Sequence, residues 1–189
     1  MKKTKLLVAL CCVLTSAIAQ NEEISITYSP ASLYRFEKWV DGRSDGQDKY
    51  FVLGAFNLEY SRYLNKWLKL GINIMYDKTV SEGIQAYYYT PYPTINSPYR
   101  SSKSAFIVAP QLDFEYLRHP AFKLYSGLNI GYAKERIRNE GGLNSSADID
   151  GLTVHINLLG FRWGQKQGFT GNIGFGYKGL INLGYFIRF

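Results

Sequence analysis

The stretch Asn182-Leu183-Gly184-Tyr185-Phe186-Ile187-Arg188-Phe189 decides the fold, because its side chains alternate between two kinds. The apolar residues share one face: Ile181, Leu183, Tyr185, Ile187 and Phe189. The other face holds Asn182, Gly184, Phe186 and Arg188. Successive side chains of a β-strand point to opposite sides, so this pattern predicts a strand. A strand that ends the chain would leave an edge open to stray pairing. We therefore expect it to close a barrel against the first strand.

The same alternation recurs in seven earlier segments of the 189-residue chain. They are Glu23–Tyr34, Tyr50–Leu64, Leu68–Asp77, Phe106–Tyr116, Lys123–Tyr132, Leu152–Trp163 and Phe169–Tyr177. In the sixth strand the phase slips at Leu158-Leu159, which predicts a β-bulge. Pro110 sits within the fourth strand, where it would remove a ladder hydrogen bond, so we expect a bulge there as well.

The predicted connections alternate in length. Residues 35–49, 79–104 and 136–150 are read as long polar loops, whereas 65–66, 119–121 and 164–168 are read as short turns. The last connection, at Lys178-Gly179, is also short. This arrangement is typical of a membrane barrel with an even number of strands. The predicted fold is therefore an all-β, eight-stranded antiparallel up-and-down transmembrane β-barrel, formed by residues 20–189.

Volume indicates which face of these strands points outward. An eight-stranded barrel has an interior only wide enough for side chains to fill, and the many Leu, Ile, Phe and Tyr side chains would overfill it. The opposite face is rich in glycine and asparagine, which suit a narrow polar interior. We expect the apolar face outside, with aromatic residues gathered near both strand ends as in a barrel in lipid. At the end toward the long loops these are Tyr34, Tyr76, Phe106, Tyr132 and Tyr177.

The N-terminus has the pattern of a secretory signal peptide. Lys2, Lys3 and Lys5 precede an apolar run at 6–14 and the motif Ala17-Ile18-Ala19, which predicts a leader over residues 1–19. Both cysteines, Cys11 and Cys12, fall within it. Removing its three lysines lowers the formal net charge from +7 to +4, which gives no case for nucleic-acid binding.

The terminal strand also carries a resemblance. Asn182, Gly184, Ile187 and Phe189 resemble the terminal signal of bacterial outer-membrane barrels, although Ile187 replaces an aromatic residue. The chain as a whole, and residues 160–189 in particular, resembles the small outer-membrane barrels common in Bacteroidetes and, more distantly, OmpX and the transmembrane domain of OmpA. The resemblance implies that the barrel assembly machinery inserts the chain into the bacterial outer membrane. It also implies that the protein is a monomer there and contacts the lipids and lipopolysaccharide of that membrane.

Charged residues gather on the polar face near the short turns. They are Glu59, Lys69, Asp113, Glu115, Lys123, Arg162 and Arg188. Buried charges persist when they are paired, so we expect an interior ion-pair network. It would be either a structural plug or the selectivity filter of a pore, and the narrow interior favours the plug.

Two further interpretations of the interior stay open. Toward the long loops it is more apolar, with Leu33, Leu53, Met75 and Ile107, which suits either core packing or a pocket for a small hydrophobic molecule as in OmpW-type barrels. His155 has serines and aspartates upstream: Ser145, Ser146, Asp148 and Asp150. That grouping would suit a lipid A-modifying enzyme, although a buried interior histidine is the simpler interpretation.

The segment 79–104 is rich in tyrosine, a residue favoured in binding surfaces. We expect this segment to form either a surface contact site or a group of residues that packs against lipid headgroups. Its residues are Tyr87, Tyr88, Tyr89, Tyr92, Tyr99 and Arg100. No motif for a cofactor, metal or nucleotide is present in the sequence. The sequence therefore predicts a non-enzymatic barrel with a structural or cell-surface role.

Overall fold

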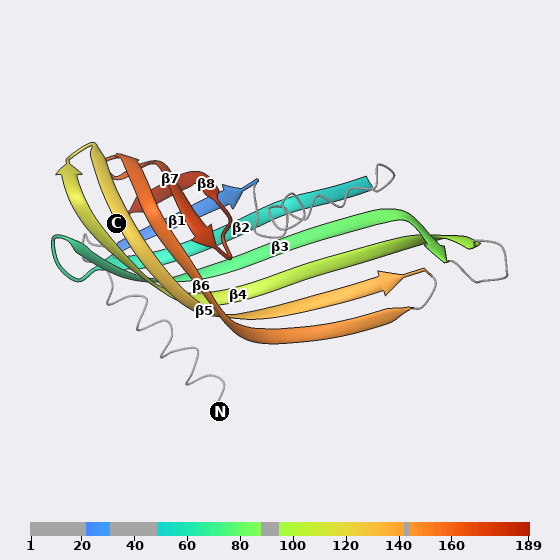
Figure 1. Cartoon of the computed structure of the whole chain (residues 1–189). Helices are drawn as coiled ribbons and strands as arrows, with labels where there is room; N and C mark the ends of the chain where they lie inside the picture. Colours follow the sequence, from blue (N-terminus) through green and yellow to red (C-terminus); the bar gives the residue numbers. More distant parts are fainter. Residues whose placement is uncertain (1–21, 31–48, 88–94, 142–143) are drawn as a thin grey trace, which may run out of the picture.

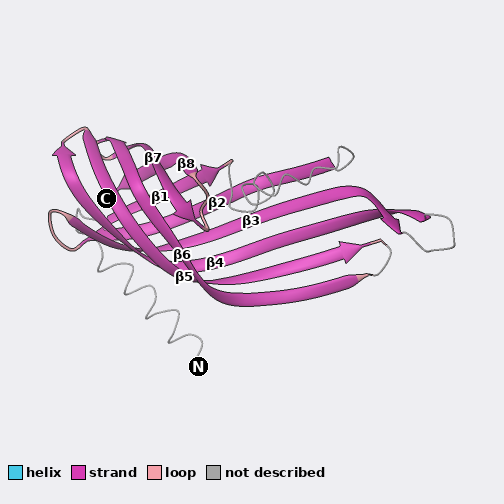
Figure 2. Ribbon diagram, viewed as in Figure 1, coloured by secondary structure: helices cyan, strands magenta, loops and turns pink. Residues whose placement is uncertain are grey.

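The computed structural model describes residues 22–30, 49–87, 95–141 and 144–189, so the predicted leader lies outside the described residues. The described residues form strands, with short turns between several of them (Figure 2). The strands are β1 (Glu22–Ser29), β2 (Lys49–Tyr63), β3 (Leu68–Tyr87), β4 (Ile95–His119), β5 (Phe122–Glu140), β6 (Ser145–Gly164), β7 (Gln167–Gly176) and β8 (Ile181–Arg188). In the part of the chain described, no helix is long and apolar enough to cross a membrane.

The strands form a closed antiparallel barrel in sequence order, which confirms the predicted fold class. Closure is made by β8, which pairs with β1 through Ile26↔Tyr185 and Thr27↔Gly184 and with β7 on its other side. The two backbones approach closely at Gly184, where an added Cβ would lie 2.0 Å from the Ile26 carbonyl oxygen. Glycine at this position therefore lets the ring close.

The side chains are distributed as the volume argument predicted. Large apolar residues in the middle of the strands face outward, among them Leu58, Ile72 and Ile130, which are 46%, 42% and 52% exposed. The inward face is polar, and its asparagines are all buried: Asn57, Asn73, Asn129, Asn157, Asn172 and Asn182. In the predicted outer aromatic group, Tyr34 lies outside the described residues, and Tyr177 differs from the prediction because it is buried inside the barrel. It follows Gly176, whose φ of +130° turns the chain inward.

The strands differ greatly in length, and this was not predicted. β1, β7 and β8 have 8, 10 and 8 residues, whereas β3, β4, β5 and β6 have 20, 25, 19 and 20. In Figure 1 the long strands run well past the short ones as a curved sheet. We call the part of β3–β6 beyond the ends of β7 and β8 the projecting sheet.

The projecting sheet overturns two predicted loops. Segment 79–104 was expected to be irregular, but β3 and β4 stay paired as far as Tyr87↔Ile95. The prediction of a loop over segment 136–150 is also wrong, because β5 and β6 pair as far as Asn139↔Ser145. Serines and charged residues occupy both faces of these extensions, so they carry no apolar alternation. Most of the third predicted loop, 35–49, lies outside the described residues.

One predicted bulge is confirmed and the other is wrong. Between Asn157↔Gly174 and Leu159↔Ile173 the register shifts by one residue, so Leu158 is the extra residue of a β-bulge. At Pro110 there is no shift, because the ladder with β3 is continuous through Ile72↔Pro110. The ladder with β5 omits the pairs at 109 and 110 and then resumes in the same register. The proline therefore interrupts pairing on one side without inserting a residue.

Replacing Gly184 by alanine tests the close approach at the seam. We expect Gly184→Ala to lower the free energy of unfolding by about 2 kcal/mol, because the new methyl group must push β1 and β8 apart. Equilibrium unfolding of the refolded barrel in urea measures this change. The matched control is Gly151→Ala, where nothing lies within 4 Å of the added carbon and the expected change is within about 0.5 kcal/mol. Equal effects at both positions would contradict the account of the seam.

Candidate functional site

Arg162 is the centre of a charged cluster inside the barrel. Its guanidinium contacts three carboxylates: Nε lies 2.8 Å from Glu23 Oε1, Nη2 lies 2.8 Å from Asp113 Oδ2, and Nη1 lies 3.2 Å from Glu115 Oε1. The side chain is only 2% exposed. Its flat face stacks on Tyr125, with 3.8 Å from the guanidinium carbon to the ring centroid. Charge and cation–π attraction together hold this arginine in place.

The bulge at Leu158 is the reason that Arg162 points inward. Before the bulge the inward residues of β6 are His155 and Asn157, and after it they are Gly160 and Arg162. Without the extra residue, Arg162 would share the outward face with the apolar side chains. Gly160 makes room for the Tyr125 ring, because a Cβ there would lie 2.2 Å from a ring atom.

The remaining charges complete the cluster. Lys69 Nζ lies 2.7 Å from Glu23 Oε1 and 3.6 Å from Asp113 Oδ2, and Arg188 Nη2 lies 2.7 Å from Glu23 Oε2. Lys123 pairs with Glu115 at 3.4 Å. The hydroxyl of Tyr63 donates to Glu115 at 2.6 Å and accepts from Lys123 and Arg188 at 3.1 and 3.2 Å.

A second ion pair lies next to this cluster. Lys178, in the turn between β7 and β8, reaches into the barrel and pairs with Glu59 at 2.6 Å. Lys178 is fully buried. Gln111 bridges the two groups, because its amide nitrogen donates to Asp113 and Glu59 while its oxygen accepts from Lys178. The connection between β7 and β8 thus acts as a cap that is anchored in the interior.

The structure places all seven charged residues named from the sequence in the interior, where each makes at least one ion pair. Sequence reasoning missed Glu23 and Lys178. Glu23 alternates in phase with the inward residues Ser25 and Thr27, so its position could have been found. Lys178 lies in a turn, where no alternation indicates a direction. With these two, the interior holds the carboxylates Glu23, Glu59, Asp113 and Glu115 against the cations Lys69, Lys123, Arg162, Lys178 and Arg188.

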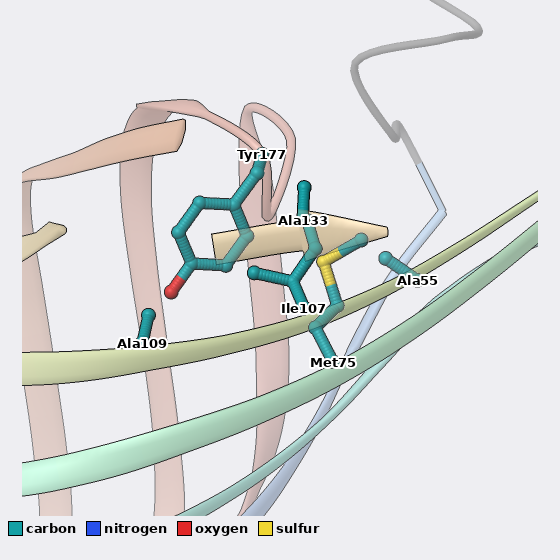
Figure 3. Close-up of a cluster of buried hydrophobic side chains, with 6 residues drawn as sticks. All are labelled: Ala55, Met75, Ile107, Ala109, Ala133 and Tyr177. Carbon is teal, nitrogen blue, oxygen red and sulfur yellow. The ribbon is translucent and has the colours of Figure 1, made fainter. Parts of the chain in front are cut away.

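From the charged cluster toward the projecting sheet, the interior is filled first by amide side chains and then by apolar side chains. Tyr177 donates its hydroxyl to Asn73 at 3.0 Å, and its ring joins the apolar cluster drawn in Figure 3. That cluster is Ala55, Met75, Ile107, Ala109, Ala133 and Tyr177, all at most 8% exposed. Met75 and Ile107 are inside as expected. Leu53 is not, because a bulge between Val52 and Gly54 turns it outward, and Leu33 lies outside the described residues.

The catalytic grouping around His155 is not assembled. His155 is fully buried, and its Nε2 lies 2.9 Å from Asn157 Oδ1. Asp148 and Asp150 are exposed; Asp148 pairs with Arg136 at 3.2 Å and Asp150 accepts from the Tyr132 hydroxyl. Ser145 and Ser146 lie nine to ten residues from His155 along β6, which corresponds to roughly 30 Å. No nucleophile among these residues is within reach of the imidazole.

The tyrosine-rich segment is described only in part. Tyr88, Tyr89 and Tyr92 lie outside the described residues, and Tyr87 ends β3. Tyr99 and Arg100 lie on β4, where Arg100 Nε is 3.3 Å from Glu82 Oε1. Among the described residues, no group of His, Cys, Asp or Glu side chains could hold a metal ion.

The four terminal-signal residues all lie on the closing strand or directly after it. Asn182 is buried between Asn57 and Asn172, with amide hydrogen bonds of 3.2 and 3.1 Å. Ile187 and Phe189 face outward, 43% and 57% exposed. Gly184 lies at the seam with β1.

No protein-family model matches the chain, and no curated protein sequence matches it. Among solved structures, the chain is similar to Ail, the attachment invasion locus protein of Yersinia pestis, with 16% identity, 90% of this chain and 96% of that chain covered, and a TM-score of 0.42. The structure of Ail with the heparin analogue sucrose octasulfate gives the same identity and coverage with a TM-score of 0.39.

Arg162 provides a test of the interior cluster. Arg162→Ala leaves three buried carboxylates short of a partner, so we expect it to lower the free energy of unfolding by roughly 4 kcal/mol. Urea unfolding of the refolded protein measures the loss. Arg136→Ala is the control, because it removes an exposed ion pair whose loss should cost about 1 kcal/mol or less. A loss at Arg162 no larger than that at Arg136 would contradict a tightly paired interior.

Proposed function

We propose that this protein is a non-enzymatic, monomeric β-barrel of the bacterial outer membrane whose projecting sheet makes contacts at the cell surface. The observation that carries the proposal is the inverted distribution of side chains. Apolar residues cover the outside of the ring, while charges and amides fill its interior. Water would penalise such an exterior, whereas acyl chains favour it.

The arrangement of aromatic residues along the barrel supports the same placement. At the short-turn end, outward-facing aromatics include Trp67, Trp163 and Phe169, and at the other end they include Tyr76, Phe106 and Tyr132. Aliphatic residues such as Leu58 and Ile72 lie between the two groups. Aromatic side chains favour the two boundaries between lipid and water, so these groups mark the edges of the embedded band.

The filled interior supports a closed barrel. Arg162, Lys69 and Glu23 occupy the charged level, and the cap that carries Tyr177 and Lys178 closes the level above it. Eight strands leave no room for an aqueous channel around such side chains. The interior is therefore proposed to be a structural plug, and the packed apolar cluster is proposed to be core.

The projecting sheet supports a role in surface contact. Its strands extend past the ring, and along β6 the residues before Val154 have no partner strand among the described residues on the β7 side. The exposed residues of such a sheet, together with the edge of β6, offer a surface for binding. The terminal residues Asn182, Gly184, Ile187 and Phe189 are proposed to be recognised by the barrel assembly machinery during biogenesis.

A charge placed on the outer surface tests the embedded band. We expect Leu58→Arg to lower the free energy of unfolding in phospholipid bilayers by about 3 kcal/mol, because the arginine would sit among acyl chains. Ser102→Arg, outward-facing on the projecting part of β4, should cost about 1 kcal/mol or less. Urea titrations in vesicles, followed by the shift in gel mobility on unfolding, give both values. If both arginines were equally tolerated, the band would not be in lipid.

Conductance tests the plug. In planar lipid bilayers we expect the refolded protein to show no steady ion current, because paired charges and packed side chains block the lumen. The double substitution Glu59→Ala and Lys178→Ala removes the anchor of the cap without leaving an unpaired charge, and we expect it to produce brief openings. Steady current through the unaltered protein would contradict the plug.

A further inference from the structure

Positive charges on the outward surface begin where the outer aromatic residues end. On β3, β4 and β5 the last outward aromatic residues are Tyr76, Phe106 and Tyr132. The next outward residues along those strands are Lys78, Ser104 and Lys134. β5 continues with Arg136 and Arg138, also exposed. The basic residues therefore lie just beyond the edge of the proposed embedded band.

The strand register brings these residues together. Lys78 is paired with Ser104, and Ser104 with Arg136, so the three lie in one row across β3, β4 and β5. Ser102 and Arg138 lie in the next row. Neighbouring strands are about 4.8 Å apart, so the backbones that carry Lys78 and Arg136 are separated by roughly 10 Å. Long basic side chains can close that gap over the small serines, whose hydroxyls add hydrogen-bond donors.

Few of these cations are neutralised by the protein. Arg136 pairs with Asp148, but in the described part of the chain Lys78, Lys134 and Arg138 form no salt bridge. Two nearby acids have other partners, because Asp150, which lies opposite Lys134, accepts from the Tyr132 hydroxyl and Glu82 pairs with Arg100. Glu140 lies two residues beyond Arg138 on the same face. This contrasts with the interior, where every cation of the charged cluster is paired. The surface cations are therefore available to bind an anion from outside the protein.

We propose that this surface, formed by Lys78, Ser102, Ser104, Lys134, Arg136 and Arg138, binds the phosphate groups of lipopolysaccharide in the outer leaflet. The inference rests on the proposed function, because it needs the barrel to sit in that membrane. Lysine and arginine are the side chains that bind phosphate best, and arginine does so with two parallel hydrogen bonds. Aromatic belts lie at the depth of the headgroups, so the residues just beyond them meet the lipid phosphates.

The test compares two forms of one lipid. Native mass spectrometry of the full barrel in a zwitterionic detergent would measure binding of lipid A with its phosphates and of the same lipid after dephosphorylation. We expect the unaltered protein to prefer the phosphorylated form. The triple variant Lys78→Gln, Lys134→Gln and Arg138→Gln should bind it on the order of a hundredfold more weakly, since each basic residue near an anionic lipid surface contributes roughly fivefold. Its binding of dephosphorylated lipid should not change.

The control removes the same charge from the other end of the barrel. Arg62→Gln, Lys66→Gln and Lys166→Gln change three exposed cations near the short turns, and we expect this variant to keep the preference for phosphate. Heat-dependent gel mobility verifies that each variant is folded; if the triple variant were not, Arg138→Gln alone should still weaken binding about fivefold. Equal loss in both triple variants, or no phosphate preference in the unaltered protein, would overturn the inference. If the protein inserts into bilayers but shows no preference for phosphorylated lipid, only this site is refuted. If the protein folds without lipid or detergent, the proposed function is refuted.

Discussion

The narrow lumen of an eight-stranded ring is the constraint on which the rest of this structure depends. Once the seam between β1 and β8 closes, the space inside holds only one layer of side chains from each strand. Asparagine, glycine and serine fit that space, and a larger side chain can enter it where a neighbour is small. Gly160 beneath Tyr125 is one such case. The bulky apolar residues are then left outside, which makes the exterior suited to lipid.

The charged cluster follows from the same constraint. Arg162 and Lys69 are removed from water, and such charges are tolerated only where partners surround them. Carboxylates from β1 and β4 supply those partners, so the cluster ties together strands that are not neighbours in the ring. The turn after β7 is held in the same way, because its buried Lys178 pairs with Glu59. The outer charges differ in kind, because Lys78 and Arg138 remain available to an external anion.

Much of the ring could be predicted from the sequence, because apolar and polar residues alternate wherever one face meets the lumen. Even the bulge at Leu158 is visible as a slip in that alternation, and it decides that Arg162 faces inward. The projecting sheet was missed because its faces carry no apolar alternation: serines and charged residues on both sides of β4 look like a loop, yet backbone pairing extends the strand. Leu53 and Tyr177 were placed on the wrong side because Gly54 and Gly176, at φ +83° and +130°, redirect the chain locally.

The seven interior charges could be named because alternation gives direction within a strand. Their pairing could not, since it depends on which strands lie opposite one another across the lumen. Lys178 illustrates the limit, because it lies in a turn and its partner Glu59 is 119 residues away in sequence.

The most direct measurement of the central claim is the surroundings of single outward-facing positions. The cysteine variants Leu58→Cys and Ser102→Cys, each labelled with a fluorophore, would be reconstituted in vesicles that contain lipids brominated along their acyl chains. The account predicts that bromine quenches the label at position 58 and that aqueous iodide quenches the label at position 102. Quenching of the label at position 58 by iodide but not by bromine would contradict it.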